Sequence, residues 1–357
     1  MNKLEEYCTS EVINWLLGDD NPSVRYLTLR NLLDKREDDL EARAARQLLM
    51  EEGCIPKIMS HQNPDGSFMT GAMVREYGEL RARSGYQPKY KNTIWQAIFL
   101  AQLGADGKDE RVRRLCNFIL NTNYSEQHGV FGIYVRRKRS LDFGAIPCFV
   151  GNMIWALSKL GAYGDPRIQR SLTWLVRHQR FDDGGFKTPK EWPYRGSKDR
   201  CFGKHSCYIG CTQSLKAAAV VPWKERGNGL RDFIRRGIDF VLMHKIYKKD
   251  HGNGRPIRRE YELLTFPLTY YDDLIGILET LLALGVKNGA LNDSMQVILK
   301  KRDRYGRWRV EKAVSGSSMH APMEKKGRES KWITYRALNV LKQYVSQAGG
   351  ERGISYV

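Results

Sequence analysis

Two neighbouring stretches decide the fold: C-F-V-G-N-M-I-W-A-L-S-K-L-G at residues 148–161, and S-L-T-W-L-V-R-H-Q-R-F-D-D-G-G-F at residues 171–186. The first is apolar on nearly every side, as a fully buried helix is, and Gly161 is a typical residue just past a helix end. The second belongs to a segment from Pro166 to about Arg180 whose apolar residues recur at helical spacing on one face. A glycine-rich turn follows at residues 182–185. Together they predict a helical hairpin with a buried inner helix and a half-exposed outer helix.

This hairpin is repeated along the chain. Further inner helices are expected at residues 24–33 and from similar runs that begin near Asn92, Cys207, Tyr271 and Lys331, with a period of about 57–65 residues. A glycine turn followed by an aromatic residue closes several copies, at Gly66-Ser67-Phe68, Gly184-Gly185-Phe186 and Gly306-Arg307-Trp308. Repeats of this length indicate an array or a ring, because one hairpin cannot bury its apolar helix alone.

The first and last helices suggest that the ring closes. The inner helix at residues 331–344 has no outer partner after it, and the amphipathic helix at residues 4–17 has no inner partner before it. If the first helix packs outside the last, six hairpins form an (α/α)6 toroid whose inner helices surround a central cavity. We therefore expect an all-α fold, with a single toroid domain over residues 1–345 and a C-terminal tail at residues 346–357.

The chain is strongly basic, because 59 Lys and Arg residues against 40 Asp and Glu residues give a net charge of +19. Such a charge suggests an anionic partner, either a hydrophobic or anionic small molecule or an acidic membrane surface. An ordinary solvated basic surface would give the same count. No module that reads RNA or DNA accompanies the basic loops, which include residues 136–139, so no nucleic acid is expected. The sequence makes no prediction about the oligomeric state.

Two missing segments and the number of cysteines bear on localisation. The chain has no run of eighteen apolar residues and no basic segment leading into an apolar core near Met1. Its seven cysteines are an odd number, which favours reduced thiols over a disulfide framework. These features predict a cytoplasmic protein.

The repeated turns and inner helices resemble the prenyltransferase/squalene-cyclase repeat superfamily, which includes terpenoid cyclases and the β subunits of protein prenyltransferases. The resemblance covers nearly the whole chain and implies a toroid that binds an isoprenoid or lipid in its central cavity. The acidic motifs of the cyclases are not matched. No D-x-D-D occurs, and Asp272-Asp273 is followed by Gly276 where the third acid of D-D-x-x-D would stand. Asp272 and Asp273 remain candidates for a general acid, a metal ligand or a helix cap.

The resemblance also implies zinc, which protein prenyltransferases hold with a D-x-C pair and with a histidine in H-x-C-Y. This chain has His205-Ser206-Cys207-Tyr208 at the start of one inner helix and Cys148 at the preceding start, with Ile146 where the aspartate would stand. A D-x-C also occurs at Asp199–Cys201. The expected metal ligands are a subset of Cys148, Cys201, His205, Cys207 and Asp273. The alternative is that the cysteines are small core residues and that His205 caps its helix.

All inner helices run in the same direction, so their amino-terminal ends should meet at one mouth of the toroid and favour an anion there. The expected cavity residues lie at or near these ends: Lys91, Asn92, Trp95, Asn152, Tyr208, Tyr271, Lys331 and Trp332. The aromatic residues among them would suit a prenyl chain or a carbocation, and would equally suit inner-helix packing. The predicted catalytic residues, if the protein is an enzyme, are Asp272, Asp273 and His205.

Three functions are compatible with this pattern. The first is a terpenoid-cyclase- or prenyltransferase-like toroid that binds a hydrophobic, anionic ligand, with zinc-assisted transfer as the candidate reaction. The second is a non-catalytic toroid that binds a ligand or a protein. The third is an (α/α)6 glycosidase, which would need two carboxylates across the cavity, whereas Asp272 and Asp273 lie on one helix.

Overall fold

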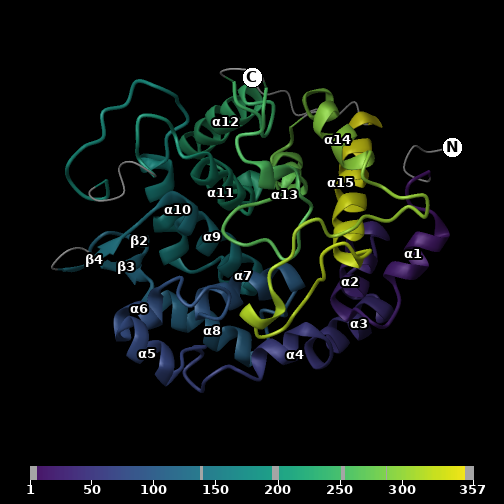
Figure 1. The fold of residues 1–357 in the computed structure, drawn as a ribbon, viewed down its shortest axis with the longest axis horizontal. Coiled ribbons are helices and arrows are strands. Elements are labelled where there is room, and N and C mark those ends of the chain that lie inside the picture. Colours follow the sequence, from purple (N-terminus) through teal and green to yellow (C-terminus); the bar gives the residue numbers. More distant parts are fainter. Residues whose placement is uncertain (1–5, 137–139, 195–200, 251–253, 287, 350–357) are drawn as a thin grey trace.

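The structure, a computed structural model, describes residues 6–136, 140–194, 201–250, 254–286 and 288–349. It is mostly helical, with two small two-stranded antiparallel sheets (Figure 1). Buried hydrophobic side chains from Val12 to Leu341 form one continuous cluster. Within the described part of the chain, no helix is long and apolar enough to cross a bilayer.

A central group of helices is buried on nearly all sides. Its members are α2 (Pro22–Leu27) with its π-helical continuation η1 (Thr28–Leu32), α7 (Thr93–Leu103), α9 (Pro147–Leu157), α11 (Tyr208–Ala219), α13 (Leu274–Ala283) and α15 (Lys331–Gly349). From α7 to α15, each member contacts the next, and α15 contacts α2 and η1. Figure 1 shows these helices grouped about a common centre. Each apolar run singled out in the sequence forms one of them.

One-sided helices lie farther from this centre. They are α3 (Leu40–Glu51), α4 (Cys54–Met59), α8 (Glu110–Thr122), α10 (Pro166–His178), α12 (Asn228–Met243) and α14 (Asn292–Leu299). In α10, Ile168, Leu172 and Leu175 are buried, whereas Gln169 and Thr173 are exposed. The apolar stripe therefore faces the central helices and the polar face lies in solvent.

The first helix is shorter than the predicted segment at residues 4–17. Helix α1 (Ser10–Leu16) begins after Thr9, whose side-chain oxygen accepts the N–H of Val12 as an N-cap, and residues 1–5 lie outside the described residues. Helix α1 contacts α15. The last helix is longer than predicted, because α15 continues to Gly349 through the first residues of the expected tail.

The glycine turns join outer helices to the next inner helix in a repeated way. Gly66 and Gly306 have φ angles of 92° and 79°, a left-handed conformation that glycine adopts without a steric penalty. The aromatic residue after each turn donates its backbone N–H to a threonine in the first turn or two of the following inner helix. The two bonds are 3.0 Å long and run from Phe68 to Thr93 Oγ1 and from Trp308 to Thr334 Oγ1.

The repeated C-x-x-G motif brings α9 and α11 close together. A Cβ atom on Gly151 would lie 2.4 Å from the carbonyl oxygen of Gln213. No side chain fits at that distance, so glycine is required where these two backbones meet.

Two segments differ from the expectation. The predicted loop at residues 73–90 contains two short helices, α5 (Gly71–Tyr77) and α6 (Glu79–Ser84). Gly78, which has a positive φ, separates the two helices. After α8 the chain forms two hairpins, which pair β1 (Tyr124–Ser125) with β2 (Val130–Phe131), and β3 (Ile133–Arg136) with β4 (Leu141–Gly144). Residues 137–139 of the predicted basic loop lie outside the described residues.

Candidate functional site

A cavity of about 730 Å³ lies among the central helices, toward the carboxyl-terminal ends of α7, α9, α11 and α13. Its polar lining includes Gln102 of α7, Lys216 of α11, Glu279 of α13 and Arg336 of α15. Its apolar lining includes the aromatic residues Tyr26, Trp155, Phe266, Trp332 and Tyr335, together with aliphatic residues such as Leu268. The carbonyl groups at helix carboxyl termini carry partial negative charge, which favours cationic side chains at this end.

The expected mouth, at the amino-terminal ends of these helices, is filled by side chains. Trp95 is fully buried, and its indole N–H donates to the carbonyl oxygen of Tyr86 at 2.8 Å. The Tyr86 ring packs against Phe149 at 5.4 Å and Tyr270 at 6.3 Å between ring centroids. These aromatic rings fill that end, and the cavity of about 730 Å³ lies toward the opposite ends of the same helices.

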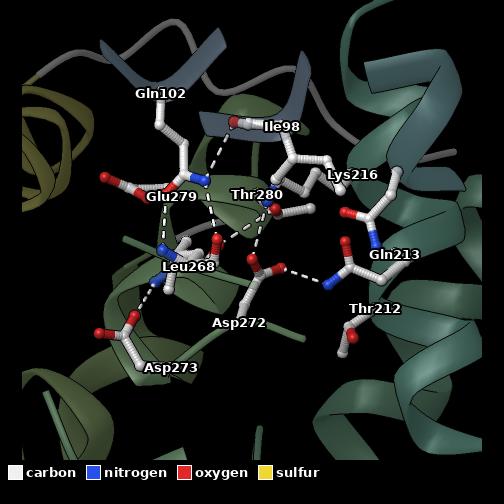
Figure 2. A network of polar contacts seen from close by, with 12 residues as sticks. Ile98, Gln102, Thr212, Gln213, Lys216, Leu268, Asp272, Asp273, Glu279 and Thr280 are labelled. Carbon is white, nitrogen blue, oxygen red and sulfur yellow. Dashed lines mark hydrogen bonds and ion pairs between the residues drawn. The ribbon is translucent and has the colours of Figure 1, made fainter. Parts of the chain in front are cut away.

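Lys216 on the cavity wall is held by a buried aspartate. Its Nζ lies 2.8 Å from Asp272 Oδ1 and 4.2 Å from the centroid of the Trp155 ring. The amide of Gln213 donates to the other oxygen of Asp272 at 2.9 Å (Figure 2). Both oxygens of Asp272, which is 1% exposed, are therefore engaged, and this predicted catalytic residue acts as an anchor for Lys216.

Arg336 is anchored in the same way by Asp273. The guanidinium lies 3.1 Å from Asp273 Oδ1 and 2.9 Å from Glu279 Oε2. Burial alone would lower the pKa of Arg336, but these two carboxylates have the larger combined effect and raise it. The two Asp273 oxygens also accept the backbone N–H groups of Gly276 and Thr265. Asp273 is thus the N-cap of α13, as in the helix-cap alternative given in the sequence analysis. It is also the ion-pair partner of Arg336.

Glu279 and Lys159 face the cavity beside these pairs. Burial raises the pKa of Glu279 against the opposing effect of Arg336. Burial lowers the pKa of Lys159, with a further lowering by Lys216, although Glu279 opposes it. No hydrogen bond or ion pair joins the Lys159 ammonium to another of the residues that the structure describes. Each of these shifts favours the neutral form of its group.

Two inner helices become π-helical where they line the cavity. In η2 (Ser158–Ala162), which continues α9, Ser158, Lys159 and Gly161 belong to the lining. In η1, Asn31 also lines the cavity, and its side-chain amide donates to the hydroxyl of Tyr335. The buried Ser158 Oγ has no hydrogen-bond partner within the described ranges. Such π-turns occur frequently at functional sites.

Most of the other predicted cavity residues lie away from this cavity. Trp332 lines it and stacks on Phe266 with ring centroids 4.0 Å apart. Asn92 and Asn152 are fully buried and donate to backbone carbonyl groups. The remaining residues have these partners: Lys331 pairs with Asp20, Lys312 donates to the Tyr271 hydroxyl, the Tyr208 hydroxyl donates to the Ile246 carbonyl, and the Lys91 carbonyl contacts the His320 ring nitrogen.

The five predicted zinc ligands are not brought together around one point. Among the described His, Cys, Asp and Glu residues, the group whose ligand atoms come within 4.8 Å of one another is Asp183, His244 and Asp250. None of the five predicted ligands belongs to this group. Asp273 is instead paired with Arg336. Burial raises the pKa of the Cys148 thiol far above its usual range, which disfavours the thiolate that would bind a metal. Nearby Cys201 and Cys207 add to that rise. His205 is exposed and contacts Asp183 through Nδ1 at 3.3 Å. Asp199 lies outside the described residues.

Comparison with known proteins gives no family. No family model and no curated protein matches the chain. Solved structures with similar folds include a protein from Actinoplanes, 13% identical over 95% of this chain and 98% of that one, with a TM-score of 0.43. They also include a possible GH105 member from Salmonella enterica, 11% identical over 88% of this chain and 97% of that one, with a TM-score of 0.39.

Type II terpene cyclase MstE from Scytonema is another similar structure, 12% identical over 82% of this chain and 96% of that chain, with a TM-score of 0.32. At these identities and TM-scores, the similarities establish neither a family nor a reaction.

Proposed function

We propose that this protein binds, in the cavity among its central helices, a small molecule that carries an anionic group and an apolar part. The observation that supports this most is Lys159, an ammonium group in the cavity wall with no partner among the described residues. The Lys159 side chain is exposed at the cavity wall, so its ammonium is accessible to a ligand that enters the cavity. A carboxylate or phosphate of a ligand would supply the missing acceptor, and the unpaired Ser158 hydroxyl could donate to the same group.

The neighbouring charges support an anion rather than a cation. Asp272 and Asp273 balance Lys216 and Arg336. Glu279 and Asp273 both pair with Arg336. Lys159 is the cation of this group that has no ion-pair partner among the described residues. An arriving anion would pair with it, whereas a cation would meet three positive side chains.

The rest of the lining supports an apolar part of the ligand. Trp155, Trp332 and Phe266 line the cavity, and apolar walls of this kind bind hydrocarbon by excluding water. A volume of about 730 Å³ is within the range of small-molecule sites. An isoprenoid diphosphate or a fatty acid has both features, and we infer that the ligand belongs to this chemical class.

We further infer that the central and outer helices form a closed (α/α)6 toroid. The order of contacts from α7 through α15 to η1, and the position of Gly104 at the end of α7 against Leu27 of α2, support closure. Contacts between α1 and α15 support α1 as the sixth outer helix.

Isothermal titration calorimetry can test the ligand class. Farnesyl diphosphate should bind about one molecule per chain, and neutral farnesol should bind at least about tenfold more weakly because it lacks the anion. Lys159→Gln should reduce the affinity for farnesyl diphosphate to that for farnesol, while Lys224→Gln on the exposed surface should change nothing.

Equal binding of the diphosphate and the alcohol, or equal effects of the two lysine variants, would contradict the proposal. Binding of a neutral oligosaccharide in preference to both probes would replace it with the glycosidase alternative.

A further inference from the structure

Three segments that are separated in sequence, around Asp183, around His205 and over residues 244–250, meet beside the amino-terminal end of α11. The turn after α10 brings Asp183, and a short backbone pairing joins Asp183 to His205 in the strand-like segment before α11. Helix α12 ends at its C-cap residue His244, and a turn stabilised by bonds between residues 247–249 and 255–257 brings Asp250. None of these groups belongs to the central cavity.

Both ring nitrogens of His244 face oxygen atoms that only accept hydrogen bonds. Nδ1 lies 3.1 Å from the carbonyl oxygen of Lys248, and Nε2 lies 3.2 Å from Asp183 Oδ2. Nδ1 also lies 3.7 Å from Asp250 Oδ1, so carboxylate oxygens approach both nitrogens of the ring. Three acceptor oxygens, from Lys248, Asp183 and Asp250, around one imidazole ring favour a cation at this point.

The spacing of the groups suits a metal ion as that cation. One ligand atom each from Asp183, His244 and Asp250 lies within 4.8 Å of the other two. Two ligands that are each about 2.0–2.1 Å from zinc at a tetrahedral angle are separated by roughly 3.3 Å, close to the 3.2 Å between His244 Nε2 and Asp183 Oδ2. We propose that Asp183, His244 and Asp250 bind one divalent transition-metal ion, for which zinc is the best match to the ligand set.

The surrounding residues hold these ligands in place. The His244 side chain is 8% exposed, and its ring packs edge-on against Phe240 and Tyr208 at centroid distances of 4.6 and 5.5 Å. His205 Nδ1 contacts the second oxygen of Asp183 at 3.3 Å and so orients this carboxylate. A hydrogen bond from the far nitrogen of a metal-binding histidine to a carbonyl group, and a second contact on a metal-binding carboxylate, are the usual outer partners of such sites.

The site is reached from solvent through an acidic hollow of about 450 Å³. Asp183 and Asp250 line this hollow together with Asp182 and Asp239, and one cation, Arg236, accompanies them. Arg180 and Arg235 pair with Asp182 and Asp239. The carboxylates of Asp183 and Asp250 instead face His244, and these two are the carboxylates that a divalent cation beside the ring would bind. Three protein ligands leave one position open toward the hollow, as in zinc sites that bind water or a substrate.

Metal analysis of tag-free protein can test this inference. We expect about one zinc ion per chain after expression with added zinc, and a d–d absorption band when cobalt replaces it. Asp183→Asn and Asp250→Asn should each weaken zinc binding by more than about tenfold. Mutation of a residue that only contacts a metal ligand already weakens affinity by about tenfold or more, and loss of a ligand should cost more than that. Asp250 is exposed, so its variant should fold. Asp239→Asn, in the same hollow, is the matched control and should bind zinc normally.

Three results would overturn the proposal. They are a wild-type protein that takes up no zinc or cobalt, Asp183→Asn and Asp250→Asn variants that bind as Asp239→Asn does, and loss of zinc in Cys207→Ser but not in Asp183→Asn. The last result would return the metal to the cysteine-containing set predicted from the sequence.

Discussion

The ammonium of Lys216 lies 2.8 Å from the carboxylate of Asp272, and their side chains are only 9% and 1% exposed. Asp272 is buried and does not line the cavity, whereas Lys216 does. The ion pair therefore links a residue of the core to a residue of the cavity wall. Arg336 and Asp273 form a second pair of this kind. The cavity is therefore lined by cations whose positions are fixed by buried carboxylates.

Asp272→Asn should destabilise the protein by about 3 kcal/mol or more, because removing one member of a buried ion pair leaves the other charge uncompensated. Urea unfolding followed by circular dichroism measures this loss. The double variant Lys216→Met/Asp272→Asn, which removes both charges, should recover much of it. A double variant that is no more stable than Asp272→Asn would contradict the pairing.

Lys159→Met should raise the melting temperature of the ligand-free protein and abolish binding of the anionic probe. Burial lowers the pKa of Lys159, so the unfolded chain binds this proton more tightly than the folded chain does. The charged form of Lys159 is therefore disfavoured in the folded chain, by an amount that solvent at this exposed side chain limits, and the effect fades as the pH rises from the lowered pKa toward the ordinary lysine value. A lower melting temperature in Lys159→Met than in the wild type would mean that Lys159 has a structural partner.

Glu324 should make stability depend on pH near neutrality. Burial raises its pKa to about 7, and the hydrogen bond from Ser330 opposes this only in part. The folded chain binds the proton more tightly than the unfolded chain, so stability is present below the ordinary glutamate value and is lost as the pH rises through about 7. The loss should stay below about 3.4 kcal/mol, because one pKa unit corresponds to about 1.36 kcal/mol.

The comparison of Glu324→Gln with Glu52→Gln isolates this effect. Glu324→Gln removes the titrating carboxyl group. It should therefore flatten the profile of unfolding free energy between about pH 5 and 8, the range in which Glu324 titrates in the folded chain. Glu52→Gln, on the exposed surface, should leave the profile unchanged. An unaltered profile in Glu324→Gln would show that this carboxyl group titrates normally.

Removal of residues 1–18 should destabilise the protein by several kcal/mol or make it insoluble. Val12 and Leu16 of α1 are fully buried, and burial of two such side chains contributes about 1.5–3 kcal/mol each. The deletion also exposes part of α15 and removes the cation–π contact between Arg307 and Trp15. Calorimetry of the truncated protein measures the effect, and an unchanged melting temperature would argue against α1 as the helix that completes the ring.

The helices could be predicted from the sequence because their signals are local. The apolar runs, the glycine turns and the one-sided outer helices each depend on residues within a few positions of one another. The partner of a glycine-turn aromatic could not be predicted, because Phe68 and Thr93 meet only when two hairpins pack together. The short hairpins near residues 124–144 were missed since strands of two to four residues carry little periodicity.

The position of the cavity could not be inferred from helix direction. Dipoles favour an anion at the amino-terminal ends, but side-chain volume decides which end is open, and Trp95 and Tyr86 fill that end. A usable signal was present. Lys216 and Glu279 are single charged residues within otherwise uncharged inner-helix segments. A charge at such a position must face either a partner or a cavity, and both residues line the cavity.

The central claim is that an anionic ligand occupies the cavity and contacts Lys159. A crystal structure of the protein with farnesyl diphosphate tests it most directly. We predict that the diphosphate lies within hydrogen-bonding distance of Lys159 Nζ, near Ser158 and Arg336, with the hydrocarbon chain against Trp155 and Trp332. A diphosphate bound at the opposite end of the central helices, near Cys148 and His205, or a cavity without ligand at saturating concentration, would contradict the account.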